Sequence, residues 1–332
     1  MINNLSELAT FTFWKSYWIT MRPYLLFVSA AAGMVGFVVG PQRGIGVSLA
    51  VFSVFFLSYG FGQALTDCFQ MDTDSLSSPY RPLVQGIISR QNVMMVSLAG
   101  LLGEGIVLFL LSPLSLIYTL LAVFGLATYT YFKRKWWAGP IYNGWIVALL
   151  PLIAILAAQG KRPSSAFIDM ISANKVIILI MLSVFFSYAN FVLMGYFKDI
   201  SADRASGYNT FVVVYGWKKA AVASDFLGLL SLFFSAWVII SIWPKISFSG
   251  WSWAAVFIYL IGLAAVVTAQ WGIHCIEDEN KAYRPISFIV RGFILLHLAE
   301  ICALRPIWLP WIVLFYLAFE LVMAKRPERK QV

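Results

Sequence analysis

Aspartates gather at two places in a 332-residue chain that otherwise contains few charges. Asp67, Asp72 and Asp74 lie in the stretch TDCFQMDTDSLSSPYRP, and Asp199 and Asp203 form a second cluster; each cluster directly follows a long apolar stretch. Carboxylate oxygens are the ligands that Mg²⁺ prefers, and Mg²⁺ commonly joins protein carboxylates to the phosphates of a substrate. The two clusters therefore predict a magnesium site if the fold brings them together. Solvated charges that end two hydrophobic helices are the alternative.

Helical spacing predicts how these side chains are presented. At 100° per residue, four polar residues fall within an arc of about 60° on one face of a continuous helix: Gln63, Asp67, Gln70 and Asp74. The second pair of aspartates, four residues apart, also shares a helix face. Cations follow both clusters, as a metal-bound phosphate or diphosphate would require: Arg81 and Arg90 after the first, and Arg204, Lys218 and Lys219 after the second.

The elements that position these residues must lie in a membrane. Hydrophobic residues make up 61% of the chain and charged residues 12%, whereas soluble domains carry about 25% charge. Apolar runs long enough to cross a bilayer recur along the chain, and in lipid they can only be helices. We predict an all-α membrane protein with runs at 24–41, 45–66, 92–112, 114–132, 140–159, 174–197, 220–242, 251–274, 286–303 and 307–324.

The distribution of Lys and Arg predicts the orientation. With a cytoplasmic N-terminus, the segments on that side hold about 17 Lys and Arg residues and the loops on the other side about six. Both termini and both aspartate clusters should then face the cytoplasm. Residues 1–20, which include Trp14 and Trp18, are expected to lie along the membrane interface. The net charge of +9 belongs to this cytoplasmic face, so no nucleic-acid partner is expected.

The first cluster resembles the opening motif of the UbiA superfamily of intramembrane prenyltransferases, approximately N-D-x-x-D-x-x-x-D followed by x-x-x-K-P-x-R-P. The stretch TDCFQMDTDSLSSPYRPLVQGIIS departs from it where Thr66 replaces Asn, Gln70 replaces Asp and Ser78 replaces Lys. The matching positions are Asp67, Asp74, Pro79, Arg81, Pro82, Gly86 and Ser89.

The second cluster is the closer match. YFKDISADRASGYNTFVVVYG is similar to the family's K-D-x-x-x-D-R-x-x-G-x-x-T-x-x-x-x-x-G, with matches at Asp199, Asp203, Arg204, Gly207, Thr210 and Gly216. MRPYLLF near the start resembles the family's Arg-Pro helix, and YTYFKRK resembles its basic loop after the fourth helix.

The resemblance implies a single domain over residues 1–332, a bundle of nine transmembrane helices around a central cavity. The apolar run at 307–324 adds a tenth, C-terminal helix, since the basic residues after it would otherwise lie outside.

The resemblance also implies the reaction. A Mg²⁺-dependent enzyme of this kind transfers an isoprenyl group from a prenyl diphosphate to an aromatic or other lipophilic acceptor and releases pyrophosphate. The implied catalytic and metal-binding residues are Asp67, Asp74, Asp199 and Asp203, with Gln63 and Gln70 as neutral partners. The residues implied to donate hydrogen bonds to the diphosphate are Arg22, Arg81, Lys198 and Arg204.

Two alternatives stay open. Some relatives cyclise a prenyl diphosphate without an acceptor, and the altered first motif is compatible with that. A carrier that binds phosphorylated lipids without chemistry would also use metal and cations. In the ninth run, Arg291, His297 and Glu300 are either functional or paired within the bundle.

Overall fold

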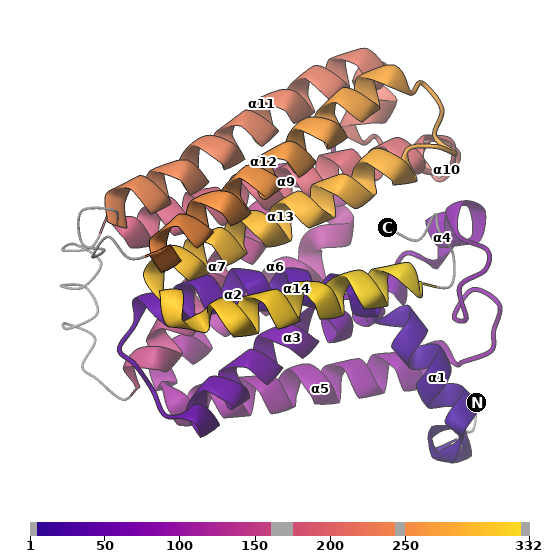
Figure 1. Cartoon of the computed structure of the whole chain (residues 1–332). Helices are drawn as coiled ribbons and strands as arrows, with labels where there is room; N and C mark the ends of the chain where they lie inside the picture. The colour runs from indigo at the N-terminus through magenta and orange to yellow at the C-terminus, as the bar shows by residue number, and fades with distance from the viewer. Residues whose placement is uncertain (1–4, 161–174, 243–249, 327–332) are drawn as a thin grey trace.

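The computed structural model describes residues 5–160, 175–242 and 250–326. In these ranges the chain is helical and contains no strand (Figure 1). The long helices are α3 (Ile45–Asp67), α5 (Arg90–Leu111), α6 (Pro113–Lys133), α7 (Gly139–Gln159), α9 (Val176–Gly195), α11 (Phe211–Ile242), α12 (Gly250–Cys275), α13 (Tyr283–Leu304) and α14 (Leu309–Ala324).

Four shorter helices complete the arrangement. They are α1 (Phe11–Thr20), α2 (Leu26–Val39), α4 (Met71–Ser77) and α10 (Ile200–Ala205). Among the described residues, nine helices are long and apolar enough to cross a membrane, or up to ten if α1 and the segment Pro23–Val39, bent by 49°, are counted as one span. The predicted helical bundle is confirmed, and a helix does occupy the run at 307–324.

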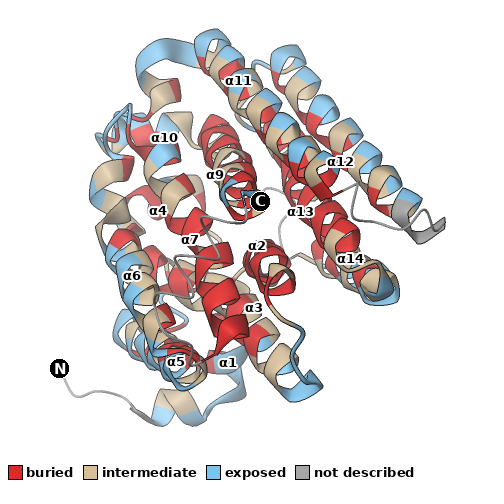
Figure 2. Cartoon of the chain, turned by 90° about the vertical axis from the view of Figure 1, so that its left-hand side faces the viewer, coloured by how far each residue is buried: buried red, intermediate tan, exposed pale blue. Residues whose placement is uncertain are grey.

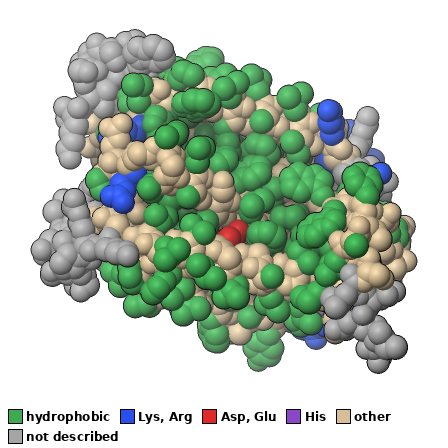
Figure 3. Space-filling model, turned by 90° about the horizontal axis from the view of Figure 1, so that it is seen from below, with side chains coloured by type: hydrophobic (Ala, Val, Ile, Leu, Met, Phe, Trp, Pro, Cys, Tyr) green, Lys and Arg blue, Asp and Glu red, His purple; other side chains and the backbone are tan. Residues whose placement is uncertain are grey.

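Buried residues gather at the centre of the bundle, and exposed residues lie on its outer helices (Figure 2). Most residues of α13 are buried, whereas few residues of α6 are. The face in Figure 3 is largely hydrophobic, with Lys and Arg toward its ends. A soluble protein could not expose so much apolar surface, so the outer faces are those that contact lipid.

Small residues let the central helices approach closely. A Cβ atom added to Gly36 of α2 would clash with the carbonyl oxygen of Pro151 in α7, and one at Gly33 would clash with the ring of Phe55 in α3. Contacts of this kind replace the hydrophobic effect as the source of helix association in lipid. They fix α2 between α3 and α7, which both reach the aspartate end of the bundle.

The first aspartate cluster does not lie on one continuous helix, so the predicted arc from Gln63 to Asp74 is wrong. Helix α3 ends at Asp67, and α4 begins at Met71. The second cluster follows a similar break, because a 3₁₀ turn at Tyr196–Lys198 separates α9 from α10. The two short helices contact each other at one end of the bundle (Figure 1). The chain turns therefore bring the clusters together.

The predicted interfacial segment is described from residue 5 onward. It forms a 3₁₀ turn and α1, whose Trp14 and Trp18 side chains are exposed. Part of the loops counted for the orientation, 161–174 and 243–249, and the tail 327–332 lie outside the described residues.

Candidate active site

A cavity lies among α2, α3, α5, α6, α7 and α9, and its polar end is formed by residues near α4 and α10. Its empty volume is about 1560 Å³, counting the open mouth. None of its described lining residues comes from α11 to α14. The first part of the chain thus builds the candidate site, and the last helices pack around it.

Most predicted site residues line this cavity. They are Arg22, Gln63, Gln70, Asp74, Arg81, Lys198 and Asp199. Asp67 lies directly behind them, in contact with Arg22 and Gln63. Asp203 is fully buried beside the cavity, whereas Arg204 is exposed and does not line it.

Arginines hold the first cluster. The Arg22 guanidinium donates to both oxygens of Asp67, at 3.0 and 3.3 Å, and Gln63 Nε2 donates to Oδ1 at 2.6 Å. Arg81 forms ion pairs with Asp67 at 3.6 Å and with Asp74. Burial raises the pKa of Asp74 above its ordinary value, although Arg81 acts in the opposite direction. These carboxylates are therefore already paired with cations.

Backbone geometry places one of these arginines. Arg22 has φ 53°, the one positive φ at a non-glycine position among the described residues. The following Pro23 restricts its backbone further, and such conformations persist when surrounding contacts hold them. The turn between α1 and α2 thereby directs the side chain toward Asp67.

The second cluster is balanced differently. Neither oxygen of the Asp203 carboxylate accepts a hydrogen bond from a described residue, and Lys133 Nζ lies 3.7 Å from Oδ1. Burial raises the pKa of Asp203 from 3.8 to about 7. An orphaned buried carboxylate of this kind is a group for which a bound cation would supply the missing partner.

Lys133, at the end of α6, was missed as a site residue. It lines the cavity, donates to Gln70 Oε1 at 3.4 Å, and lies over the rings of Tyr196 and Tyr208. Its position in YTYFKRK was a signal, but only the fold shows that Lys133 turns inward. It links the two clusters, because Gln70 belongs to the first and Asp203 to the second.

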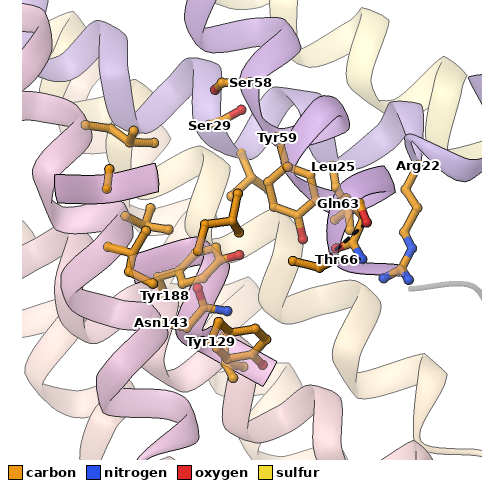
Figure 4. Close-up of a pocket in the computed structure, with 18 of the residues that line it drawn as sticks. Arg22, Leu25, Ser29, Ser58, Tyr59, Gln63, Thr66, Tyr129, Asn143 and Tyr188 are labelled. Carbon is orange, nitrogen blue, oxygen red and sulfur yellow. Dashed lines mark hydrogen bonds between the residues drawn. The ribbon is translucent and has the colours of Figure 1, made fainter. Parts of the chain in front are cut away.

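Below the charged rim, tyrosines surround the cavity. Tyr59, Tyr129 and Tyr188 lie around it together with Asn143 (Figure 4). The hydroxyl of Tyr129 is 3.2 Å from that of Tyr196. The π faces of aromatic rings stabilise a positive charge. Further from the rim, the lining is mainly aliphatic, which suits a hydrocarbon tail.

The oxygen ligands at the rim suit a Mg²⁺ ion that is also bound by substrate phosphates. Among the described residues, no three Asp, Glu, His or Cys side chains converge to cage a metal unaided. Carboxylates and glutamine oxygens nevertheless line one rim beside cations. Mg²⁺ commonly takes one or two protein carboxylates together with substrate phosphates, and this arrangement matches that mode.

The family model described as "UbiA prenyltransferase family" matches residues 25–290, and the chain belongs to this family. It is an integral membrane prenyltransferase. A digeranylgeranylglyceryl phosphate synthase of Pyrococcus furiosus is 23% identical over 222 residues, covering 66% of this chain and 75% of that protein. The Thermococcus gammatolerans synthase of the same name is 27% identical over 211 residues, covering 61% and 71%.

Solved structures share the fold. A UbiA homolog from Aeropyrum pernix K1 aligns with a TM-score of 0.67 at 16% identity, covering 84% of this chain and 96% of that one. A UbiA homolog from Archaeoglobus fulgidus, bound to DMAPP and Mg²⁺, aligns with a TM-score of 0.60 at 18% identity, covering 86% and 99%. The UbiA-type bundle predicted from the motifs is thus confirmed.

Proposed function

We propose that the enzyme transfers an isoprenyl group from a prenyl diphosphate to a lipophilic acceptor, with Mg²⁺ as cofactor and pyrophosphate as product. The observation that carries the proposal is the charged rim at the mouth of an aliphatic cavity: the rim suits a diphosphate and the cavity suits its tail. The Archaeoglobus fulgidus structures with DMAPP or GPP and Mg²⁺ support the choice of donor.

In the proposed reaction, the bond between the isoprenyl C1 and the diphosphate oxygen breaks, and its electron pair leaves with pyrophosphate. The acceptor forms a bond to C1 and loses a proton. Bound Mg²⁺, held by Asp74, Asp199 and Asp203 with Gln63 or Gln70, would neutralise diphosphate charge, while Asp67 holds Arg22 and Arg81 at the rim.

The side chains of the rim stabilise the leaving group, and those of the cavity wall stabilise the reacting carbon and exclude water. Arg22, Arg81, Lys133 and Lys198 donate to the leaving diphosphate, and preorganised donors of this kind act where charge develops. The tyrosine rings stabilise positive charge at C1, and the apolar wall excludes water. Arg204 is a weaker candidate than the sequence suggested, because its side chain is exposed.

The resemblance implies an aromatic or other lipophilic acceptor, and within that range we propose a glyceryl phosphate lipid. Several relatives are named digeranylgeranylglyceryl phosphate synthase, a name that places two geranylgeranyl groups on a glyceryl phosphate. We also propose that the rim faces the cytoplasm, on the strength of the Lys and Arg distribution.

The test is pyrophosphate release by the purified protein in detergent, with prenyl diphosphates of several lengths and either glyceryl phosphate or aromatic acceptors. Release should require Mg²⁺ and be lost in Asp199→Asn and Asp203→Asn. Glu277→Gln is the matched control, because Glu277 is an exposed carboxylate that pairs with Lys218. Product mass separates transfer from cyclisation. Tight diphosphate binding without release would contradict the proposal and favour the carrier.

A further inference from the structure

Glu104 is an acidic residue in the wall of the membrane-embedded cavity. It lies in α5 between Leu101 and Leu108, which line the same cavity, and its side chain is buried. Its Oε1 atom has no hydrogen-bond partner among the described residues. In either protonation state, a buried carboxyl oxygen without a partner costs free energy. An aliphatic residue would fill the position more cheaply, so the carboxyl group calls for an explanation.

Glu104 lies far from the charged rim. It is about four helical turns, or about 21 Å, along α5 from Arg90, whose backbone carbonyl contacts Cys68 beside Asp67. On the neighbouring α6, Thr119 is a similar distance from Lys133 and also lines the cavity. The intervening lining of α6 includes Ala122, Val123 and Leu126. The carboxyl group therefore lies deep in a mostly apolar passage, about one turn before Leu108.

A second buried acid shows that the bundle does provide partners for such groups elsewhere. The two oxygens of Glu300 in α13 contact the Ser183 hydroxyl at 2.6 Å and His297 Nδ1 at 3.1 Å. Glu300 does not line the cavity. Glu300, which faces packed helices, has hydrogen-bond partners within the protein. For Glu104, which faces the cavity, a partner would have to come from the contents of the cavity.

We propose that Glu104 sets the length of the isoprenoid tail that the cavity accepts. The inference rests on the proposed function, because it assumes that a prenyl tail enters the cavity. Hydrocarbon cannot hydrogen-bond, so a tail long enough to cover the carboxyl group would bury it without a partner and exclude any water from it. Tails that end before Glu104 avoid this cost. The residue thus determines specificity and takes no part in bond breaking.

Binding of unreactive donors tests the proposal. Thiolodiphosphate analogues with geranyl, farnesyl, geranylgeranyl and geranylfarnesyl tails are titrated by calorimetry in detergent with Mg²⁺. Wild-type affinity should increase with tail length until the tail meets Glu104 and then decrease. In Glu104→Leu, affinity for the first disfavoured tail should rise at least about tenfold, while affinity for shorter tails changes little. Glu104→Gln keeps a polar group and should keep the wild-type profile.

A shifted carboxyl group provides an independent readout. In the double variant Leu101→Glu with Glu104→Leu, the acid lies about one turn nearer the rim, so the preferred tail should become shorter. An unchanged length profile in thermally stable Glu104→Leu protein would overturn the inference and leave the proposed function intact. Wild-type protein that binds none of the analogues would instead contradict the proposed function, and the inference with it.

Discussion

Asp67 ends the long helix α3 and Asp203 lies in the short α10 at the same end of the bundle, yet their charges are balanced differently. Asp67 contacts the guanidinium groups of Arg22 and Arg81. Asp203 has Lys133 at 3.7 Å and accepts no hydrogen bond from a described residue. The first carboxylate stabilises the ligand-free fold by fixing two arginines at the rim. The second lacks hydrogen bonds that would tie it into the ligand-free fold, and the proposed function assigns it to the metal. Substitution of Asp67 should therefore mainly lower stability, whereas substitution of Asp203 should mainly lower activity.

The largest expected effect is on catalysis at Asp203. Asp203→Asn removes a negative charge from the cluster that would hold the metal, and we expect kcat/KM for pyrophosphate release to fall about 1000-fold. The melting temperature of metal-free protein should fall less than in Asp67→Asn, because Asp203 accepts no hydrogen bond from a described residue and lies 3.7 Å from Lys133 Nζ, so less is lost with its charge. Steady-state kinetics and thermal unfolding measure both. A large loss of stability would show that the fold needs this charge.

Asp67→Asn should show the reverse balance. It leaves Arg22 and Arg81 with less compensation in a buried site, so we expect the free energy of unfolding to fall by about 3 kcal/mol. Asp72→Asn is the control, because Asp72 pairs with Arg134 at an exposed position and should cost less than about 1 kcal/mol. Equal melting temperatures for the two variants would mean that the buried pairs do not hold the rim.

The pH dependence of stability separates the clusters further. Burial raises the pKa of Asp203 to about 7, so folded protein binds this proton more tightly than unfolded protein does. Its stabilising contribution is full below a pH of about 4 and is lost as the pH rises through about 7. Metal-free wild type should therefore lose stability over that range relative to Asp203→Asn. Parallel melting curves for the two proteins would contradict the assignment.

The positions of the helices and the order of the motifs could be predicted from the sequence. The length of each apolar run and the placement of charges determine which segments can cross a bilayer as helices. The sequence could not reveal the break after Asp67, since no glycine or proline marks residues 68–70. The direction of Lys133 was also unreadable, because a cation at a helix end points outward as easily as inward. In the ninth run, Glu300 contacts His297 within the bundle and Arg291 pairs with Glu320 of α14, which are contacts that the structural alternative predicts.

Substitution of Glu279 is expected to have the smallest effect, and it tests the difference between the two aspartate clusters. Its carboxylate, in the loop between α12 and α13, accepts hydrogen bonds from the Ser201 backbone N–H at 2.9 Å and from its hydroxyl at 2.6 Å. These bonds hold the first turn of α10, which begins beside Asp199. A pair of such bonds at an exposed position contributes about 1 kcal/mol.

Glu279→Ala should therefore raise the Mg²⁺ concentration needed for half-maximal activity by about fivefold, with kcat at saturating Mg²⁺ nearly unchanged. Glu279→Gln keeps an oxygen that can accept one of the bonds and should lie between wild type and the alanine variant. The first cluster is held by buried arginines and the second by this exposed loop. Substitution of Glu279 should therefore affect the position of the second cluster and leave the first in place. A fall in kcat that excess Mg²⁺ does not restore would show that the loop acts on the reaction itself rather than on the placement of Asp199 and Asp203.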